Sequence, residues 1–179
     1  LGWPGVTKHP QIARYDIARN IWNYTHKMFT SEETWNWCRE GLAECSRYAE
    51  DAGVILALQN HAPVIRDYKD VLKMVDEVNS PNLKVSLDVP IMVDKSPENI
   101  RKAAKAVGTL QVLSHFGGEY KRDEDGKVKG PEFYTSFVKS MHEIGYSGYL
   151  SYELCHPLPV VNGQTVGVEY AEKNAQLAC

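Results

Sequence analysis

Four short apolar segments of this chain each end on a side chain that can bind a metal ion. The four residues are Gln59, Asp88, His115 and Glu153. Two carboxylates, an imidazole and an amide oxygen suit a hard or borderline divalent cation. Mn²⁺ or Mg²⁺ is therefore the expected metal, and Zn²⁺ or Co²⁺ is the alternative. Four such side chains at the same position in successive segments predict one shared metal site.

Each of these residues also has a purely structural interpretation when it is taken alone. Gln59 can satisfy the backbone amides of a turn, Asp88 can cap the next helix, and His115 can be a hydrogen-bonded residue of the core. Glu153 is harder to explain in this way, because an unpaired carboxylate is costly to bury. The metal hypothesis therefore depends on the four positions together.

The segments that carry these residues are predicted to be β-strands. Each is short, rich in aliphatic residues or Tyr, and bounded by Gly, Pro or Asn. Helical patterns separate them, which predicts βαβ units and a parallel sheet of the (β/α) TIM-barrel type. In such a barrel, side chains at the carboxyl ends of the strands share the mouth where chemistry takes place. The expected strands are residues 54–59, 83–88, 110–115 and 148–153.

The helices between the strands have local start and stop signals. Thr30 and Glu33 form a capping box at the start of the first helix, and Gly53 ends it. The spacing of Trp35, Cys38, Leu42, Cys45 and Ala49 predicts one buried face on that helix. Further helices are expected at 68–78, from 97 to Gly108, from 131 to about 144, and from 168 onward, with polar loops at 117–130 and 155–166.

The length of 179 residues predicts a single domain with a substantial core. Residues 1–29 are expected to be rich in loops, and residues 30–179 alternate helix and strand. A complete eight-stranded barrel needs roughly 250 residues. We therefore expect a partial barrel with the last four strands, cut from a longer chain; the alternative is a complete small α/β protein. A half barrel would expose two strand edges, which predicts a homo-oligomer or association with the missing half.

Composition excludes several other classes of protein. A net charge of −3 and a pI near 6.1 argue against a general binder of nucleic acid or anionic membranes. No apolar run approaches the ~18 residues of a membrane span, and no signal peptide is visible. The expected location is cytoplasmic, although a truncated N-terminus could have lost a signal. The spacing of the four Cys residues indicates neither a disulfide framework nor a zinc knuckle.

Three motifs resemble the sugar phosphate isomerase/epimerase family of xylose isomerase-like TIM barrels. They lie at residues 56–61, 114–119 and 145–153. The resemblance covers nearly the whole chain and implies that its strands are the fifth to eighth of a barrel. It also implies that Asp88, His115 and Glu153 are metal ligands. Gln59 stands where that family has Glu, so its oxygen can bind the metal but the side chain cannot accept a proton.

The resemblance implies an enzyme of carbohydrate metabolism. Its expected activity is that of a divalent-metal-dependent sugar or sugar phosphate isomerase/epimerase, which abstracts a proton next to a carbonyl through a metal-stabilised enediolate. Epimerases of the family use two metal-bound Glu residues, and only Glu153 remains here. One-base chemistry is therefore expected, with Glu153 as the base and His61 or His156 as a second acid or base. Both His residues have an alternative role as hydrogen-bonded groups behind the site.

Substrate contacts are predicted for residues that follow the strand ends. His61 and His156 are assigned there, together with Glu119 and Arg122 from the segment after His115. The alternative for Arg122 is a solvated charge in an acidic loop. Gly117 and Gly118 do not decide whether the sugar is phosphorylated, because they do not form a phosphate-binding loop.

Three other functions compete with this hypothesis. A phosphodiesterase of the endonuclease IV kind is disfavoured, because no Asp-x-His motif occurs and Ile91 stands where that group has His. A keto-sugar lyase or dehydratase could use the same site. A decayed sugar-binding protein is the third, and Gln59 is the feature in its favour. Recovered epimerase activity in Gln59→Glu would indicate a decayed enzyme, whereas unchanged turnover would indicate one-base chemistry.

Overall fold

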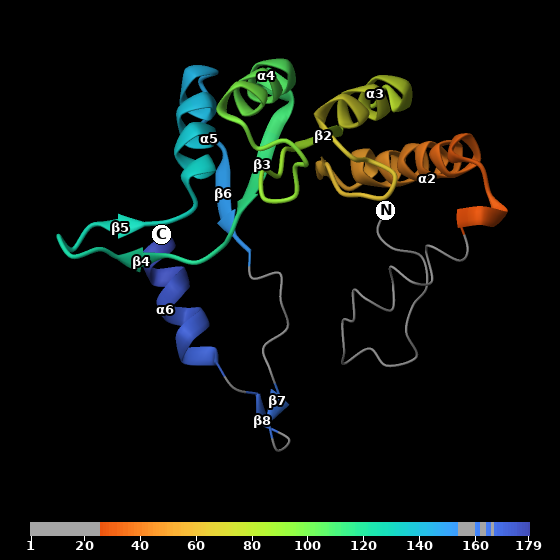
Figure 1. Cartoon of the computed structure of the whole chain (residues 1–179). Coiled ribbons are helices and arrows are strands. Elements are labelled where there is room, and N and C mark those ends of the chain that lie inside the picture. The colour runs from red at the N-terminus through yellow and green to blue at the C-terminus, as the bar shows by residue number, and fades with distance from the viewer. Residues whose placement is uncertain (1–25, 154–159, 162–163, 166) are drawn as a thin grey trace.

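A computed structural model describes residues 26–153, 160–161, 164–165 and 167–179 of the chain (Figure 1). Its centre is a four-stranded sheet in which every neighbouring pair of strands is parallel. The strands follow chain order across the sheet: β1 (Leu56–Gln59), β2 (Leu83–Ser86), β3 (Gln111–Phe116) and β6 (Tyr149–Tyr152). Sequential parallel strands with helices between them are the arrangement of a TIM barrel, so the predicted fold class is confirmed.

Helices join the strands and cover one side of the sheet. The helical segments are η1 (His26–Met28), α2 (Ser31–Asp51), α3 (Tyr68–Val78), α4 (Pro97–Val107), η2 (Gly108–Leu110), α5 (Glu132–Glu143) and α6 (Val168–Ala178). In Figure 1, α5, α4, α3 and α2 follow one another from left to right along the sheet, and each contacts the next along this row. Each strand therefore connects to the next through a crossover helix, which leaves the carboxyl ends of all four strands at one edge.

Local capping explains where these helices begin. Thr30 accepts a hydrogen bond from the backbone of Glu33, and the Glu33 carboxylate accepts one from the backbone of Thr30, which confirms the predicted capping box. Asp67 caps α3 and Ser96 caps α4, with Pro97 at the first helical position. Asn79 ends α3 in the left-handed conformation.

The hydrophobic core lies between the sheet and this row of helices. Its fully buried members come from both layers: Val85 and Leu87 from the β2 segment, Val71 and Met74 from α3, Ile100 from α4 and Phe137 from α5. Burial of such side chains supplies the main favourable term in folding. The core therefore holds the sheet against the buried faces of the helices.

The structure corrects three details of the sequence interpretation. Cys45 is exposed and Ser46 is buried, because α2 packs mainly along α3 and buries a different face from the one that its apolar spacing predicts. The predicted loop 117–130 contains an antiparallel hairpin of β4 (Lys121–Arg122) and β5 (Val128–Lys129). The predicted loop 155–166 contains a second short pair, β7 (Val160–Val161) and β8 (Gln164–Thr165).

The outer strands of the sheet each pair on one side within the described residues. On β6, Tyr149 is 81% exposed. An apolar side chain on an unpaired strand edge is a site where another chain can associate, but oligomerisation stays a prediction. Among the described helices, none combines the length and apolar character that a membrane crossing requires.

The contribution of the core can be tested on two neighbouring residues of α5. Phe137 is fully buried, whereas Val138 is 50% exposed. We expect Phe137→Ala to lower the free energy of unfolding by about 3–5 kcal/mol, because it leaves a cavity, and Val138→Ala to change it by less than about 0.5 kcal/mol. Urea unfolding followed by circular dichroism measures both. Equal effects of the two substitutions would contradict this placement of the core.

Candidate metal centre

Four predicted site residues lie together at the carboxyl edge of the sheet. Gln59 is the last residue of β1, His115 lies near the end of β3, and Glu153 directly follows β6. Asp88 is the exception, since β2 ends at Ser86 and Asp88 lies two residues farther on. Parallel pairing brings these segments to the same edge although they span much of the chain.

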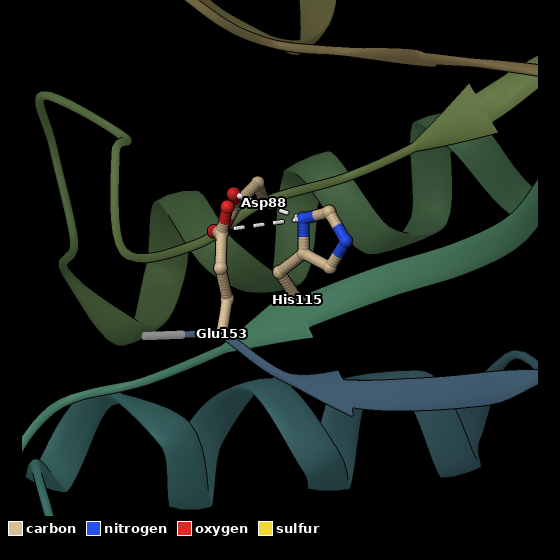
Figure 2. Close-up of side chains that lie close together, drawn as sticks. All are labelled: Asp88, His115 and Glu153. Atoms are coloured by element: carbon tan, nitrogen blue, oxygen red, sulfur yellow. Dashed lines mark ion pairs between the residues drawn. The ribbon is translucent and has the colours of Figure 1, made fainter. Parts of the chain in front are cut away.

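Asp88, His115 and Glu153 form a group that could hold one metal ion. One ligand atom from each lies within 4.8 Å of the other two. His115 Nδ1 is 3.6 Å from Asp88 Oδ2 and 3.7 Å from Glu153 Oε2. Figure 2 shows the three side chains pointing toward one another from three separate segments. Separations of this size suit ligands that share a cation, since each metal–ligand bond is about 2.0–2.2 Å long.

Gln59 contacts the same group through its amide nitrogen. Its Nε2 donates to Asp88 Oδ2 over 2.5 Å and lies 3.1 Å from His115 Nδ1. An amide nitrogen does not bind cations, and the oxygen does. Gln59 could therefore act as a ligand only after its terminal amide turns over. The structure brings Gln59 to the predicted place, and its role as a ligand stays a prediction.

The Asp88 carboxyl group is in an environment that favours a cation. Its side chain is 1% exposed, and within the described residues its Oδ1 has no hydrogen-bond partner. Burial raises the pKa of Asp88 to about 6 from its ordinary value of 3.8; His115 opposes this shift and the negative charge of Glu153 adds to it. A buried carboxylate oxygen without a partner is costly. A bound divalent cation would remove this cost, so the residues present fit the expected metal.

Glu153 is held through its backbone, while its side chain stays 42% exposed. Its amide donates to the carbonyl of Phe116 over 2.8 Å, which extends the pairing of β3 and β6 by one residue. A Cβ atom at Gly117 would lie 2.9 Å from the Glu153 carbonyl oxygen. Gly117 also donates to the Tyr134 hydroxyl over 2.5 Å. The absence of a side chain at Gly117 thus permits the close approach that places Glu153.

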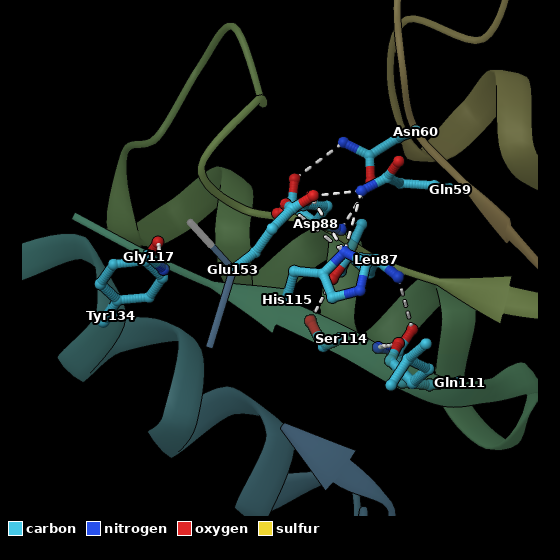
Figure 3. A network of polar contacts seen from close by, with 11 residues as sticks. Gln59, Asn60, Leu87, Asp88, Gln111, Ser114, His115, Gly117, Tyr134 and Glu153 are labelled. Carbon is cyan, nitrogen blue, oxygen red and sulfur yellow. Dashed lines mark hydrogen bonds and ion pairs between the residues drawn. The ribbon is translucent and has the colours of Figure 1, made fainter. Parts of the chain in front are cut away.

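A network of polar side chains holds the segment that carries Asp88 (Figure 3). The Gln111 side chain accepts from the backbone of Leu87 over 3.0 Å. Ser114 donates to the carbonyl of Leu87, and Asn60 contacts the backbone of Asp88. The sequence interpretation assigned no role to Asn60, Gln111 or Ser114. The available signal for Gln111 and Ser114 was a polar residue inside a segment predicted to be an apolar strand, whereas Asn60 directly follows such a segment.

Within the described residues, His61 has no hydrogen bond or ion pair to this group of three side chains. His61 is partly buried, and its Nδ1 donates to the Ala62 carbonyl over 2.6 Å. Because that hydrogen bond uses one ring nitrogen, a neutral His61 has Nε2 as its proton acceptor. His156 lies outside the described residues. The catalytic and substrate-binding roles of both His residues stay predictions.

Arg122 belongs to β4 of the hairpin that extends away from the sheet (Figure 1), and Glu119 lies two residues before β4. Glu119 is exposed and forms an ion pair with Lys121 at 3.4 Å. Arg122 donates to the carbonyl of Gly126 over 2.8 Å, which stabilises the hairpin turn. The contact of Arg122 agrees with its alternative role as a solvated charge. The predicted substrate contacts of Glu119 and Arg122 remain predictions.

Comparison with known proteins relates this arrangement to one family and to solved sugar epimerases. Residues 9–173 match the family described as xylose isomerase-like TIM barrel. The structure resembles D-psicose 3-epimerase from Clostridium cellulolyticum H10, solved with D-tagatose, with 22% identity and a TM-score of 0.62 over 84% of this chain and 55% of that one. It also resembles 3-keto-D-glucoside 4-epimerase from E. coli, with 15% identity and a TM-score of 0.62 over 99% and 62% of the chains.

A third solved structure, L-ribulose 3-epimerase, is 21% identical with a TM-score of 0.53 over 80% of this chain and 57% of that one. The chain therefore spans about half the length of the solved structures that it matches. No curated protein sequence matches it. At these identities the structural likeness establishes the fold, and the chemistry must be argued from the site.

Protonation of Asp88 should compete with metal binding. Because the pKa of Asp88 is about 6, a cation that binds below pH 6 must displace a proton. We expect the affinity for Mn²⁺ to be constant above pH 7 and about tenfold weaker at pH 5. Titration calorimetry at several pH values measures this, with Asp88→Asn as the variant that should bind weakly throughout. An affinity that does not change between pH 7.5 and pH 5 would contradict the assignment.

The raised pKa of Asp88 also makes the stability of the metal-free protein depend on pH. The folded state holds the Asp88 proton more tightly than the unfolded state, so this group stabilises the fold below pH 3.8, and the contribution is lost as the pH rises through about 6. Metal-free Asp88→Asn should therefore have a higher melting temperature than the wild type at pH 7.5. A lower melting temperature in this variant would show that the Asp88 carboxylate does not destabilise the metal-free fold.

Proposed function

This chain belongs to the xylose isomerase-like TIM barrel family, and on that premise we propose that it carries the metal-binding part of the active site of a sugar isomerase or epimerase. The observation that carries the proposal is the convergence of Asp88, His115 and Glu153, from three separate segments, beside a buried carboxylate oxygen that has no hydrogen-bond partner among the described residues. Such a group is typical of a site that binds a hard cation.

The proposed cofactor is a divalent cation held by Asp88, His115 and Glu153. Mn²⁺ or Mg²⁺ suits two carboxylates and an imidazole, and Zn²⁺ or Co²⁺ is the alternative. Gln59 would add its amide oxygen after the amide turns over, which would also end its hydrogen bond to Asp88. The bound ion would act as a Lewis acid that stabilises negative charge on a substrate oxygen.

The two carboxylates differ in exposure, and this difference suits them to different roles. Asp88 is buried and can only hold the ion, whereas Glu153 is 42% exposed and can reach a substrate in the mouth of the sheet. We assign Glu153 as the base that takes a proton from the hydroxyl-bearing carbon next to the substrate carbonyl and then delivers a proton, exchangeable with solvent, to the former carbonyl carbon, while the hydroxyl proton moves to the former carbonyl oxygen. Gln59 cannot accept a proton, so the reaction that fits best is a one-base isomerisation.

The substrate class is argued from the related proteins and remains part of the proposal. The solved neighbours are named for their action on D-psicose, 3-keto-D-glucoside and L-ribulose, all of which carry a ketone group. A metal beside a single carboxylate base suits such a substrate, because the ketone acidifies the neighbouring C–H bond. We therefore propose a keto-sugar or its aldose isomer as the substrate.

One observation favours a second candidate. The Gln59 amide nitrogen lies 2.5 Å from Asp88, so a neutral donor occupies a contact that a cation would otherwise make. This supports the alternative of a sugar-binding protein that kept the fold and lost its chemistry.

A keto-sugar lyase or dehydratase is a further alternative. It needs only the same proton abstraction followed by β-elimination, and it shares every group assigned above.

Proton exchange with solvent tests the proposed function directly. With Mn²⁺ and a panel of keto-sugars in D₂O, we expect deuterium at the carbon next to the carbonyl. Glu153→Gln should lower the exchange rate by about 10²–10⁴-fold, since it removes the general base. Glu124→Gln, an exposed carboxylate in the β4–β5 hairpin, is the matched control and should not change it. If no carbon of any sugar in the panel exchanges in the metal-loaded wild type, proton abstraction is excluded.

The role of Gln59 is tested by Gln59→Glu. One-base chemistry predicts tighter Mn²⁺ binding, from the added negative charge, with unchanged isomerisation. New epimerase activity in this variant would instead identify the wild type as a decayed epimerase. Turnover and stereochemistry are followed together by NMR of the product sugars.

A further inference from the structure

Asp88 occupies a position where the backbone pairing of the sheet no longer holds the chain. The paired residues of β1 and β2 end at Gln59 and Ser86, and the register between β2 and β3 shifts at the same place. Asp88 lies two residues past that end. Its position must therefore depend on contacts other than the regular strand ladder.

Asn60 supplies these contacts to both backbone groups of Asp88. Its Oδ1 accepts from the Asp88 amide over 2.6 Å, and its Nδ2 donates to the Asp88 carbonyl over 2.9 Å. Both residues are 0% exposed. Two buried hydrogen bonds from one side chain to the amide and the carbonyl of one residue fix where its Cα atom lies and which way its side chain leaves the backbone.

The Asp88 carboxylate would not stay in place without such a restraint. It is buried, and within the described part of the chain only one of its two oxygens has a hydrogen-bond partner. The segment would relieve this cost by turning the carboxylate toward water. The contacts from Asn60 oppose that movement, because they would have to break first and leave buried polar groups unpaired.

We propose that Asn60 is a positioning residue that holds Asp88 where it can bind the cation. The proposal rests on the metal centre proposed above. Asn60 touches neither substrate nor metal, and it acts through the backbone of Asp88. Loss of its side chain should therefore weaken metal binding without removing a ligand.

The chain contains a matched control at the opposite end of the same two strands. Asn82 precedes β2, and its Nδ2 donates to the carbonyl of Val54 over 2.7 Å. Its own carbonyl accepts from Leu56 over 2.8 Å. Asn60 and Asn82 thus each join the segments of β1 and β2 through a side-chain amide, but only Asn60 lies beside the metal centre.

The test compares Asn60→Ala with Asn82→Ala in Mn²⁺ affinity, by titration calorimetry, and in amide exchange of the metal-free protein, by NMR. We expect Asn60→Ala to bind Mn²⁺ about 10–100-fold more weakly, as is common when a group that orients a ligand is removed. The Asp88 amide should exchange faster in this variant. Asn82→Ala should bind within about threefold of the wild type and leave the Asp88 amide protected.

Asn60→Asp keeps the shape of the side chain and covers the case in which Asn60→Ala does not fold. Added negative charge near the site would by itself strengthen cation binding. An aspartate oxygen facing the Asp88 carbonyl, however, would replace an attractive contact by a repulsive one. Weaker Mn²⁺ binding in folded Asn60→Asp would therefore support positioning, and equal or tighter binding would overturn it.

The outcomes separate this inference from the proposed function. If the wild type binds no divalent cation, the metal centre is wrong and the role of Asn60 falls with it. If the wild type binds Mn²⁺ and Asn60→Ala binds it equally well, only the positioning role is overturned. Equal losses in Asn60→Ala and Asn82→Ala would also overturn it, because the effect would then come from joining the strands.

Discussion

The site depends on a carboxylate that the fold keeps away from water. Asp88 is buried, one of its oxygens lacks a partner within the described residues, and its pKa is raised to about 6 as a result. A protein tolerates this cost where surrounding contacts hold the group and a cation can compensate it. The parallel sheet, the core behind it and the polar side chains around Leu87 and Asp88 together meet that requirement.

The two carboxylates of the site each end a segment that the sequence predicts to be a strand, but their surroundings differ. Asp88 points into the packed edge of the sheet, while Glu153 leaves β6 at a position where its side chain remains partly exposed. A buried group is suited to holding an ion, and an accessible one to exchanging a proton with a substrate. The proposed division of roles follows from this difference in burial.

Gln59 stands where the resemblance drawn from the sequence implies a Glu ligand. Its amide donates to Asp88 and lies against His115, so it stabilises the metal-free arrangement of the other side chains. A glutamate there would place a third negative charge beside Asp88 and Glu153, and like charges repel in such a confined site. The substitution therefore changes both the charge of the site and the number of bases that it can offer.

The sequence by itself determined the alternation of strand and helix, the capping box at Thr30, and the four residues that meet at the carboxyl edge. These features depend on neighbouring residues and on one topological rule, so a linear pattern can reveal them. Only the tertiary structure decided that Asp88 lies beyond the end of β2, held by Asn60, Gln111 and Ser114, and that Cys45 is exposed. Those outcomes depend on contacts between residues distant in the chain, and on how much of a helix face its neighbour covers, which residue spacing does not encode.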